Sequence, residues 1–264
     1  MGAVLDNAIE LYRHAFRSCW VISLVGTVLT TAVRLRADMD MPNVSFGGKN
    51  LQQFGADLVQ ALQHMNGGVG SLLNNLLVLL LELVLYGSLF AQMHHVAAHA
   101  RPLATLDALI LGVRRLPGMV LSSVIFMVAV FVGFVLFLIP GFYLWGKLEF
   151  WVAAAFADDA GAIGGLGRSW EITTGNWWRS ATAVTVALII VVVLNSGADV
   201  VGLILLAFTH DLTTLLLVTQ TFQGIAAVFV LPMLPAAALA IYYDLKLRRE
   251  GDDLLIRANS LQTA

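Results

Sequence analysis

The apolar run from Met119 to Ala157 constrains the fold of this chain more than any other feature. As one straight helix it would be about 58 Å long at 1.5 Å per residue. That is nearly twice the roughly 30 Å hydrocarbon core of a bilayer. Pro140 and Gly141 lie inside the run, and proline ends a helix while glycine permits a reversal. We therefore predict two membrane helices, 119–139 and 141–157, joined by a tight hairpin turn at Pro140–Gly141 on the non-cytoplasmic side.

The composition of the whole chain also indicates a membrane protein. Of its 264 residues, 59% are hydrophobic and 12% are charged, about half the charged fraction of an average soluble domain. The mean hydropathy is +0.83. A net charge of −2 gives no basic character for binding nucleic acid, and no nucleic-acid partner is predicted. A single cysteine, Cys19, excludes an internal disulfide.

Other apolar segments of near-membrane length bring the predicted number of crossings to six. Two amphipathic stretches, 3–17 and 51–65, are predicted to lie on the membrane surface, and an ordinary helix packed on protein is the alternative for the second. The predicted fold is an all-α polytopic membrane helical bundle, a single integral membrane domain over residues 1–264. The predicted spans are 19–33, 72–93, 119–139, 141–157, 179–208 and 221–243.

Lys and Arg residues are distributed unequally between the two sides that six crossings define. Eleven of the fifteen fall in the two termini and in the loops at 94–118 and 158–179, and three fall on the opposite side. Cytoplasmic segments carry the excess of Lys and Arg in membrane proteins. Both termini are therefore predicted to be cytoplasmic, and residues 244–264 are predicted to form a basic cytoplasmic tail.

Aromatic and basic side chains gather at the predicted cytoplasmic surface. Trp and Tyr are enriched where a membrane meets water, and Lys and Arg reach anionic lipid headgroups there. A specific headgroup pocket and a protein docking site are the alternatives to a general interfacial belt. The predicted lipid-interface residues are Arg168, Trp170, Trp177, Trp178, Arg179, Tyr242, Tyr243, Lys246, Arg248 and Arg249.

Three stretches carry a resemblance to a known family: "IPGFYLWGKLEF", "GGLGRSWEITTGNWWRS" and "YYDLKLRREGDDL". Together they resemble the YciC-like family of bacterial inner-membrane proteins, over about residues 120–256. The region is also similar to the membrane domain that precedes some glycerophosphodiester phosphodiesterases. Gly165 and Leu166 stand where the family usually has Ala-Leu. The resemblance implies a multi-helix protein of the bacterial inner membrane and no particular biochemical activity.

Motifs for catalysis or metal binding are sparse. His95 and His99 lie four residues apart, a spacing that can bind zinc, but no acidic or thiol partner is near them in the sequence. We find no nucleophile elbow, no HExxH motif and no His–carboxylate pair on an obvious common face. The sequence therefore predicts no catalytic residue, no metal site and no cofactor, although intramembrane enzymes can divide their active sites among helices.

Three charged side chains, Glu82, Lys147 and Glu149, lie inside apolar segments. A charge at the bilayer centre costs roughly 2.5–3.5 kcal/mol on the insertion scale, so each is predicted to face a polar partner. Lys147 and Glu149 point about 200° apart around a helix and cannot easily pair. We predict a buried pair between Glu82 and Lys147, on the second and fourth predicted spans, with Glu149 facing another polar group or the cytoplasmic half of a cavity. If the pair forms, it would either fix the packing of the helices or respond to protons or ions. The remaining alternative is that the two side chains do not meet.

These features favour a non-enzymatic inner-membrane protein that organises or maintains the envelope. It would act through membrane lipids, other membrane proteins or a second copy of itself. The alternative is a small transporter or channel for an ion, lipid or amphiphile. Its motivation is the intramembrane charges, together with Asn195, Asp199 and Asp211 near a predicted break in the fifth span. An intramembrane enzyme is the third hypothesis.

Overall fold

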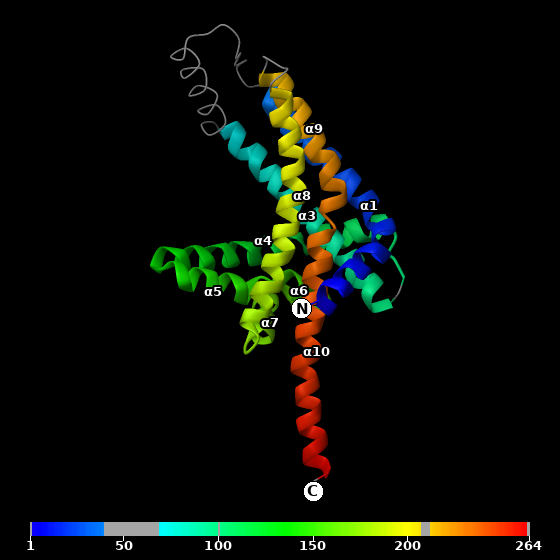
Figure 1. Ribbon diagram of the computed structural model, residues 1–264, viewed down its shortest axis with the longest axis vertical. Coiled ribbons are helices and arrows are strands. Elements are labelled where there is room, and N and C mark those ends of the chain that lie inside the picture. The colour runs from blue at the N-terminus through cyan, green and yellow to red at the C-terminus, as the bar shows by residue number, and fades with distance from the viewer. Residues whose placement is uncertain (1, 40–68, 100, 207–211, 263–264) are drawn as a thin grey trace.

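The computed structural model describes residues 2–39, 69–99, 101–206 and 212–262, and every regular element in these ranges is a helix (Figure 1). Within these ranges, five helical stretches are long and apolar enough to cross a membrane. The predicted all-α membrane bundle is therefore confirmed. The five stretches are Val4–Arg34, Leu72–His99, Thr105–Leu136, Trp177–Gly197 and Leu217–Gly251.

Helix α1 (Gly2–Met39) combines the predicted surface helix and the first predicted span in one element. Figure 1 shows it bending between its first turns and its longer part. The Ser18 hydroxyl donates to the Ala15 carbonyl at 2.7 Å, a contact that often accompanies helix bending. Helix α3 (Val69–His99) packs along α1. The second predicted surface helix, residues 51–65, lies outside the described residues.

Helices α4 (Thr105–Leu136) and α5 (Leu138–Leu148) form a hairpin that projects from the bundle (Figure 1). The chain reverses at Phe137, which has an extended backbone with φ −163° and ψ 155°. Pro140 and Gly141 follow in the first turn of α5, where a proline is well tolerated. Gly141 lies so close to α4 that a Cβ there would meet the Phe134 ring at 2.5 Å.

The predicted span 141–157 is two short helices, α5 and α6 (Trp151–Ala157), and neither is long enough to cross a membrane. The break falls at Glu149 and Phe150. Ser169 of α7 (Gly161–Thr173) binds both sides of this break. Its hydroxyl accepts the Phe150 N–H at 3.1 Å and donates to the Lys147 carbonyl at 2.8 Å. These bonds from a distant helix satisfy backbone groups that a continuous helix would satisfy itself.

Helix α8 (Trp177–Leu206) starts after Gly175, whose φ of +87° lets the chain turn sharply out of α7. The predicted last span, 221–243, is divided between α9 (Leu212–Val230) and α10 (Met233–Gln262). Pro232 lies at their junction, as expected for a residue that lacks a backbone donor. The predicted basic tail is the continuation of α10.

Small residues let the membrane helices approach closely. A Cβ on Gly112 of α4 would lie 2.2 Å from the Ser88 hydroxyl and 2.6 Å from the Val84 carbonyl of α3. Close backbone approach matters here because lipid gives no hydrophobic force between membrane helices.

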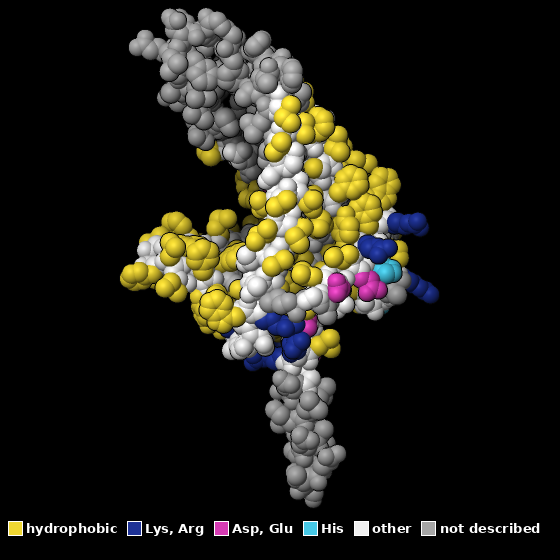
Figure 2. Space-filling view, in the orientation of Figure 1, with side chains coloured by type: hydrophobic (Ala, Val, Ile, Leu, Met, Phe, Trp, Pro, Cys, Tyr) yellow, Lys and Arg dark blue, Asp and Glu magenta, His cyan; other side chains and the backbone are white. Residues whose placement is uncertain are grey.

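On the outer surface, apolar and basic side chains occupy different regions. Figure 2 shows apolar side chains over the hairpin and over the upper part of the bundle, and basic side chains lower down, near α7 and α10.

Candidate functional site

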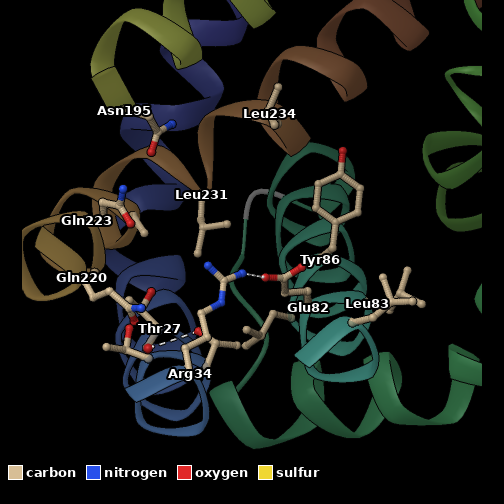
Figure 3. A pocket seen from close by; sticks show the side chains of 16 residues that line it. Thr27, Arg34, Glu82, Leu83, Tyr86, Asn195, Gln220, Gln223, Leu231 and Leu234 are labelled. Carbon is tan, nitrogen blue, oxygen red and sulfur yellow. Dashed lines mark hydrogen bonds and ion pairs between the residues drawn. The ribbon is translucent and has the colours of Figure 1, made fainter. Parts of the chain in front are cut away.

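A cavity of about 610 Å³ lies between α1, α3, α8, α9 and the start of α10 (Figure 3). Its wall is rich in polar side chains, which are uncommon inside membrane bundles and often mark ligand sites. They come from four helices that are far apart in the sequence. The polar residues that line it are Thr27, Thr30, Thr31, Arg34, Glu82, Tyr86, Asn195, Gln220 and Gln223.

Arg34 and Glu82 form an ion pair in the wall of this cavity. The guanidinium Nη2 donates to the Glu82 Oε1 at 2.5 Å (Figure 3). Their side chains remain 51% and 46% exposed. The pair therefore neutralises two charges inside the bundle while leaving both groups reachable from the cavity.

The predicted pair between Glu82 and Lys147 is wrong. Glu82 bonds to Arg34, and the Lys147 ammonium donates instead to the Thr174 hydroxyl at 2.8 Å. The prediction ended the first membrane helix at residue 33 because Arg34 is charged. The structure continues α1 to Met39, and this places Arg34 beside α3.

A polar stripe leads away from the ion pair along α1. Ser23, Thr27 and Thr31 follow one another at four-residue intervals and share a face with Arg34. The hydroxyls of Ser23 and Thr27 are buried without a hydrogen-bond partner among the described residues. Unsatisfied buried hydroxyls are costly, so this stripe is a place where a ligand group or water would gain hydrogen bonds.

An apolar groove of about 560 Å³ lies between α1 and α9. It shares Thr27, Thr31 and Gly224 with the polar cavity, so the contact between α1 and α9 separates the two hollows. At this contact, a Cβ on Gly224 would lie 3.1 Å from the Thr31 hydroxyl. A polar cavity and an apolar groove thus lie on either side of the contact between α1 and α9.

Lys147 is buried, with 3% of its surface exposed, at the end of α5. Its ammonium lies 5.1 Å from the Trp170 ring centroid and 5.7 Å from that of Tyr143. Cation–π contacts of this kind stabilise a desolvated cation. Among the described residues, no carboxylate lies within ion-pair distance of Lys147. The Lys147 side chain therefore links the end of α5 to the end of α7 through these contacts.

Glu149 lies in the turn between α5 and α6 and is half-buried. Its backbone N–H donates to the Trp145 carbonyl at 3.0 Å, and its carboxylate lies near the Trp145 side chain. It is also close enough to interact electrostatically with Tyr86, which lines the polar cavity. Glu149 thus lies near Tyr86, a residue of the cavity wall.

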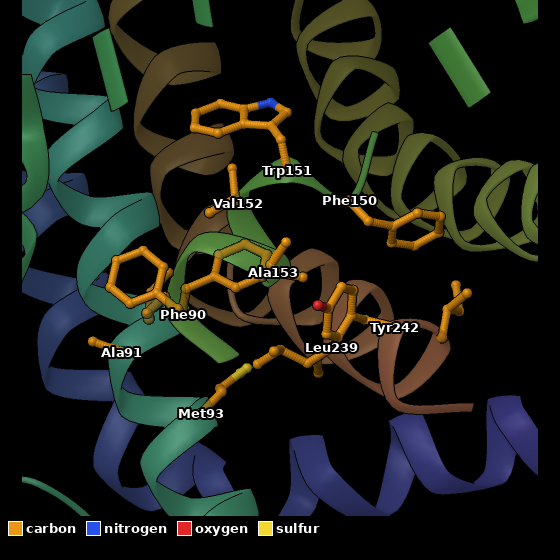
Figure 4. Packing of buried hydrophobic residues seen from close by; sticks show 14 of the residues in the cluster. Phe90, Ala91, Met93, Phe150, Trp151, Val152, Ala153, Leu239 and Tyr242 are labelled. Atoms are coloured by element: carbon orange, nitrogen blue, oxygen red, sulfur yellow. The ribbon is translucent and has the colours of Figure 1, made fainter. Parts of the chain in front are cut away.

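Asp158, between α6 and α7, is the centre of an ion-pair network. Its Oδ2 accepts from the Arg168 Nε at 2.7 Å and from the Tyr242 hydroxyl at 2.6 Å, and its Oδ1 accepts from the Lys246 Nζ at 2.5 Å. Tyr242 also belongs to the hydrophobic cluster that contains Phe150 (Figure 4). The network therefore links α7 and α10 next to the buried core that Tyr242 helps to form.

Several predicted lipid-interface residues are engaged within the protein. Arg168 and Lys246 bind Asp158, while Arg179 and Arg248 both bind Asp244, at 3.0 and 3.1 Å. The remaining contacts are to other polar groups. The Trp177 indole donates to the Tyr143 carbonyl at 3.1 Å, and Arg249 donates to the Thr174 carbonyl at 3.1 Å. The Tyr243 hydroxyl contacts His94 at 2.7 Å. Two of the predicted residues have exposed side chains: Trp178 is 79% exposed and Trp170 is 42% exposed.

The Asp158 network predicts a specific dependence of stability on pH. Burial alone would raise the pKa of Asp158, but hydrogen bonds from Lys246, Tyr242 and Arg168 outweigh it and hold the pKa below its ordinary value of 3.8. Such a carboxylate stabilises the fold above its unfolded-state pKa, and this contribution is lost as pH falls through the lower folded-state pKa. We expect the thermal midpoint in detergent to fall steeply below about pH 4, and to fall less in Asp158→Asn.

Tryptophan fluorescence during heating, at a series of pH values, measures this difference. Other carboxylates also titrate in this range, so the comparison with Asp158→Asn isolates the contribution of Asp158. Parallel curves for the two proteins would contradict the prediction.

The described residues contain no cluster of three His, Cys, Asp or Glu side chains that could hold a metal ion. His94 contacts Tyr243, and His95 contacts the Arg101 carbonyl at 2.7 Å. His95 and His99 stack with their ring centroids 4.5 Å apart. The histidines therefore serve local contacts in the structure.

Sequence reasoning missed most of the cavity. It identified Glu82 and Asn195 but neither Arg34 as a partner nor Gln220 and Gln223 as lining residues. The available signal was the presence of these polar side chains within apolar segments.

Comparison with known protein families, with curated proteins and with solved structures finds no match.

Proposed function

We propose that this protein is a non-enzymatic, lipid-associated accessory or scaffold factor of the bacterial inner membrane, and that it holds the headgroup of a membrane lipid or similar amphiphile in the polar cavity. The observation that carries the proposal is the Arg34–Glu82 ion pair, which lies in the cavity wall with both side chains about half exposed. Charges inside membrane bundles are costly and mark ligand paths. A cavity that leaves both charges reachable favours a ligand with charges of its own.

The two charged groups favour a headgroup that carries phosphate, with or without an ammonium group. A guanidinium binds phosphate through two parallel hydrogen bonds, and a carboxylate accepts hydrogen bonds from an ammonium group. Arg34 and Glu82 would take these roles. The nearby apolar groove between α1 and α9 offers a surface for an acyl chain.

The proposal also includes location and partners. Both termini lie in the cytoplasm, as supported by the excess of Lys and Arg in those segments. The resemblance to the YciC-like family supports the bacterial inner membrane. Anionic headgroups on the cytoplasmic side are proposed as further lipid partners, at the basic residues near α7 and α10 and not in the cavity, and other membrane proteins or a second copy are additional candidates.

A transporter of an ion or amphiphile is the second candidate. The polar stripe of Ser23 and Thr27 favours it, because two buried hydroxyls without a described partner extend the polar surface beyond the cavity. Flux of a charged lipid or of an ion in proteoliposomes distinguishes transport from binding alone.

The test of the proposed function uses Arg34→Met, Glu82→Gln and the double variant. Each single variant leaves one charge unpaired, so its stability should fall, and the double variant should recover part of that loss. Lipid binding should behave differently. Loss of one charge-assisted hydrogen bond is worth roughly 1.5–3 kcal/mol, so binding should weaken about tenfold or more, and the double variant should not recover it.

Native mass spectrometry of the protein with a phosphatidylethanolamine or a phosphatidylglycerol measures the bound lipid. Arg13→Met, on an exposed part of α1, is the matched control and should retain lipid. A double variant that binds either lipid as well as the wild type does would overturn the proposal and leave the ion pair a packing contact.

A further inference from the structure

The outer part of the α4–α5 hairpin is apolar on all sides. From Val124 to Phe142 the sequence contains no charged or polar side chain. The exposed fractions are 76% for Phe137 and 82% for Ile139 at the tip. Figure 2 shows this part projecting with apolar side chains on its visible face and no charged ones. A turn that emerged into water on the far side of a membrane would be expected to carry polar side chains.

The contact between the hairpin and the start of α8 limits how far the tip reaches. Trp177, Trp178 and Arg179 open α8 and are the residue types that mark a membrane surface. The Trp177 indole donates to the Tyr143 carbonyl at 3.1 Å. Tyr143 is six residues from Phe137, which is about 9 Å along a helix. Figure 1 shows the hairpin projecting sideways, across the direction of α8, so the tip stays near the level at which α8 begins and does not reach the far end of that helix.

The backbone of the tip is adapted to an environment without water. The Phe137 N–H donates to the Gly133 carbonyl at 3.0 Å, and the Phe137 carbonyl accepts from the Gly141 N–H at 3.3 Å. Pro140 has no N–H, which removes one of the donors that a helix start leaves unsatisfied. Unpaired backbone groups are strongly disfavoured in hydrocarbon, so these features favour a tip inside the membrane.

We infer that the α4–α5 hairpin enters only the leaflet at which α8 begins, with Phe137 among the lipid acyl chains. The occupant of its apolar surface is lipid, and the hairpin acts as a wedge that adds protein volume to one leaflet. The distribution of Lys and Arg agrees with this arrangement. No charged residue lies between Arg115 and Lys147, so the charge on each side of the membrane is the same whether the hairpin crosses or returns.

Single cysteines test this inference in a Cys19→Ala background, in proteoliposomes. Phe137→Cys should resist a membrane-impermeant maleimide added to either side and react after denaturation. Asp159→Cys, at a position whose side chain is 86% exposed, should react from one side and reports orientation. Reaction of Phe137→Cys from the side opposite to Asp159→Cys would show a crossing hairpin, and reaction from the same side would show a hairpin in water; either result overturns the inference.

A second measurement distinguishes whether lipid or protein covers the tip. A fluorophore on Phe137→Cys, in nanodiscs that each hold one copy, should be quenched by lipids brominated in the middle of the acyl chain. It should be quenched less by lipids brominated near the headgroup. If the cysteine is protected from maleimide but the fluorophore is not quenched, protein covers the tip and the wedge is excluded.

Discussion

Replacing Asp158 with asparagine is expected to lower the stability of the folded protein by about 3 kcal/mol, because it leaves partly buried cations without their counter-charge. The side chain of Asp158 is 14% exposed, and those of Arg168 and Lys246 are 23% and 28% exposed. Water therefore compensates only in part for the lost carboxylate. Asparagine also turns an amide NH₂ toward donors and cannot accept all three hydrogen bonds. For a chain of this size, 3 kcal/mol corresponds to a decrease of about 6–12 °C in the thermal midpoint.

Asp159→Asn is the matched control for this prediction. The Asp159 side chain is 86% exposed and pairs with Arg115, and exposed ion pairs contribute less than about 1 kcal/mol. Its backbone has a φ of +52°, which asparagine tolerates well. Thermal unfolding in one detergent at neutral pH compares the two variants. Equal midpoints for Asp158→Asn and Asp159→Asn would show that the network does not stabilise the fold.

Replacing Gly112 with leucine is expected to separate α3 from α4 and to lower the stability of the folded protein strongly. The closest atoms to a new Cβ include the Val84 carbonyl at 2.6 Å and the Ser88 backbone nitrogen at 3.0 Å. A backbone clash cannot be relieved by a change of rotamer, so one helix must move. Overpacking in a tight core costs about 1–3 kcal/mol and occasionally more, and we expect the upper end here. The measurement is the yield of monodisperse protein in detergent, together with its thermal midpoint.

Gly197→Leu provides the control for a glycine in a membrane helix. A Cβ at Gly197 of α8 would meet nothing within 4 Å. Both substitutions exchange glycine for a better helix former, so the intrinsic helix preference changes equally. Gly197→Leu should therefore keep or slightly improve stability. If Gly112→Leu behaved in the same way, the close contact between α3 and α4 would not be needed for folding.

The sequence predicted the helices better than it predicted their ends. Long apolar runs are a local property, and they correctly indicated an all-α membrane bundle. The first predicted span ended at residue 33 because counting apolar residues treats Arg34 as a boundary. In the structure Arg34 continues α1 because Glu82 neutralises it. Arg34 thus continues the helix beside a partner that lies 48 residues away in the sequence, which a local count of apolar residues does not detect.

The break between α5 and α6 shows a second limit. Nothing in the local sequence at Glu149 and Phe150 stops a helix. The break is stabilised by Ser169 and by Thr173, whose hydroxyl lies 3.3 Å from the Lys147 carbonyl. The basic residues show the same limit, because Lys246 meets Asp158 across 88 residues of sequence. Residue type indicated an interface, but only the fold shows which charges are already neutralised.

The unbroken length of α10 has a mechanical consequence. Leu234, in its first turn, lines the polar cavity, and Tyr242 and Lys246, two to three turns later, bind Asp158. A helix of 30 residues is a rod about 45 Å long. A rod moves as one body. A ligand in the cavity that shifted the first turn of α10 would therefore also shift the partners of Asp158, and it would displace the far end of the helix by a larger distance. The occupied and empty states of the proposed ligand cavity would then differ in the position of the far end of α10.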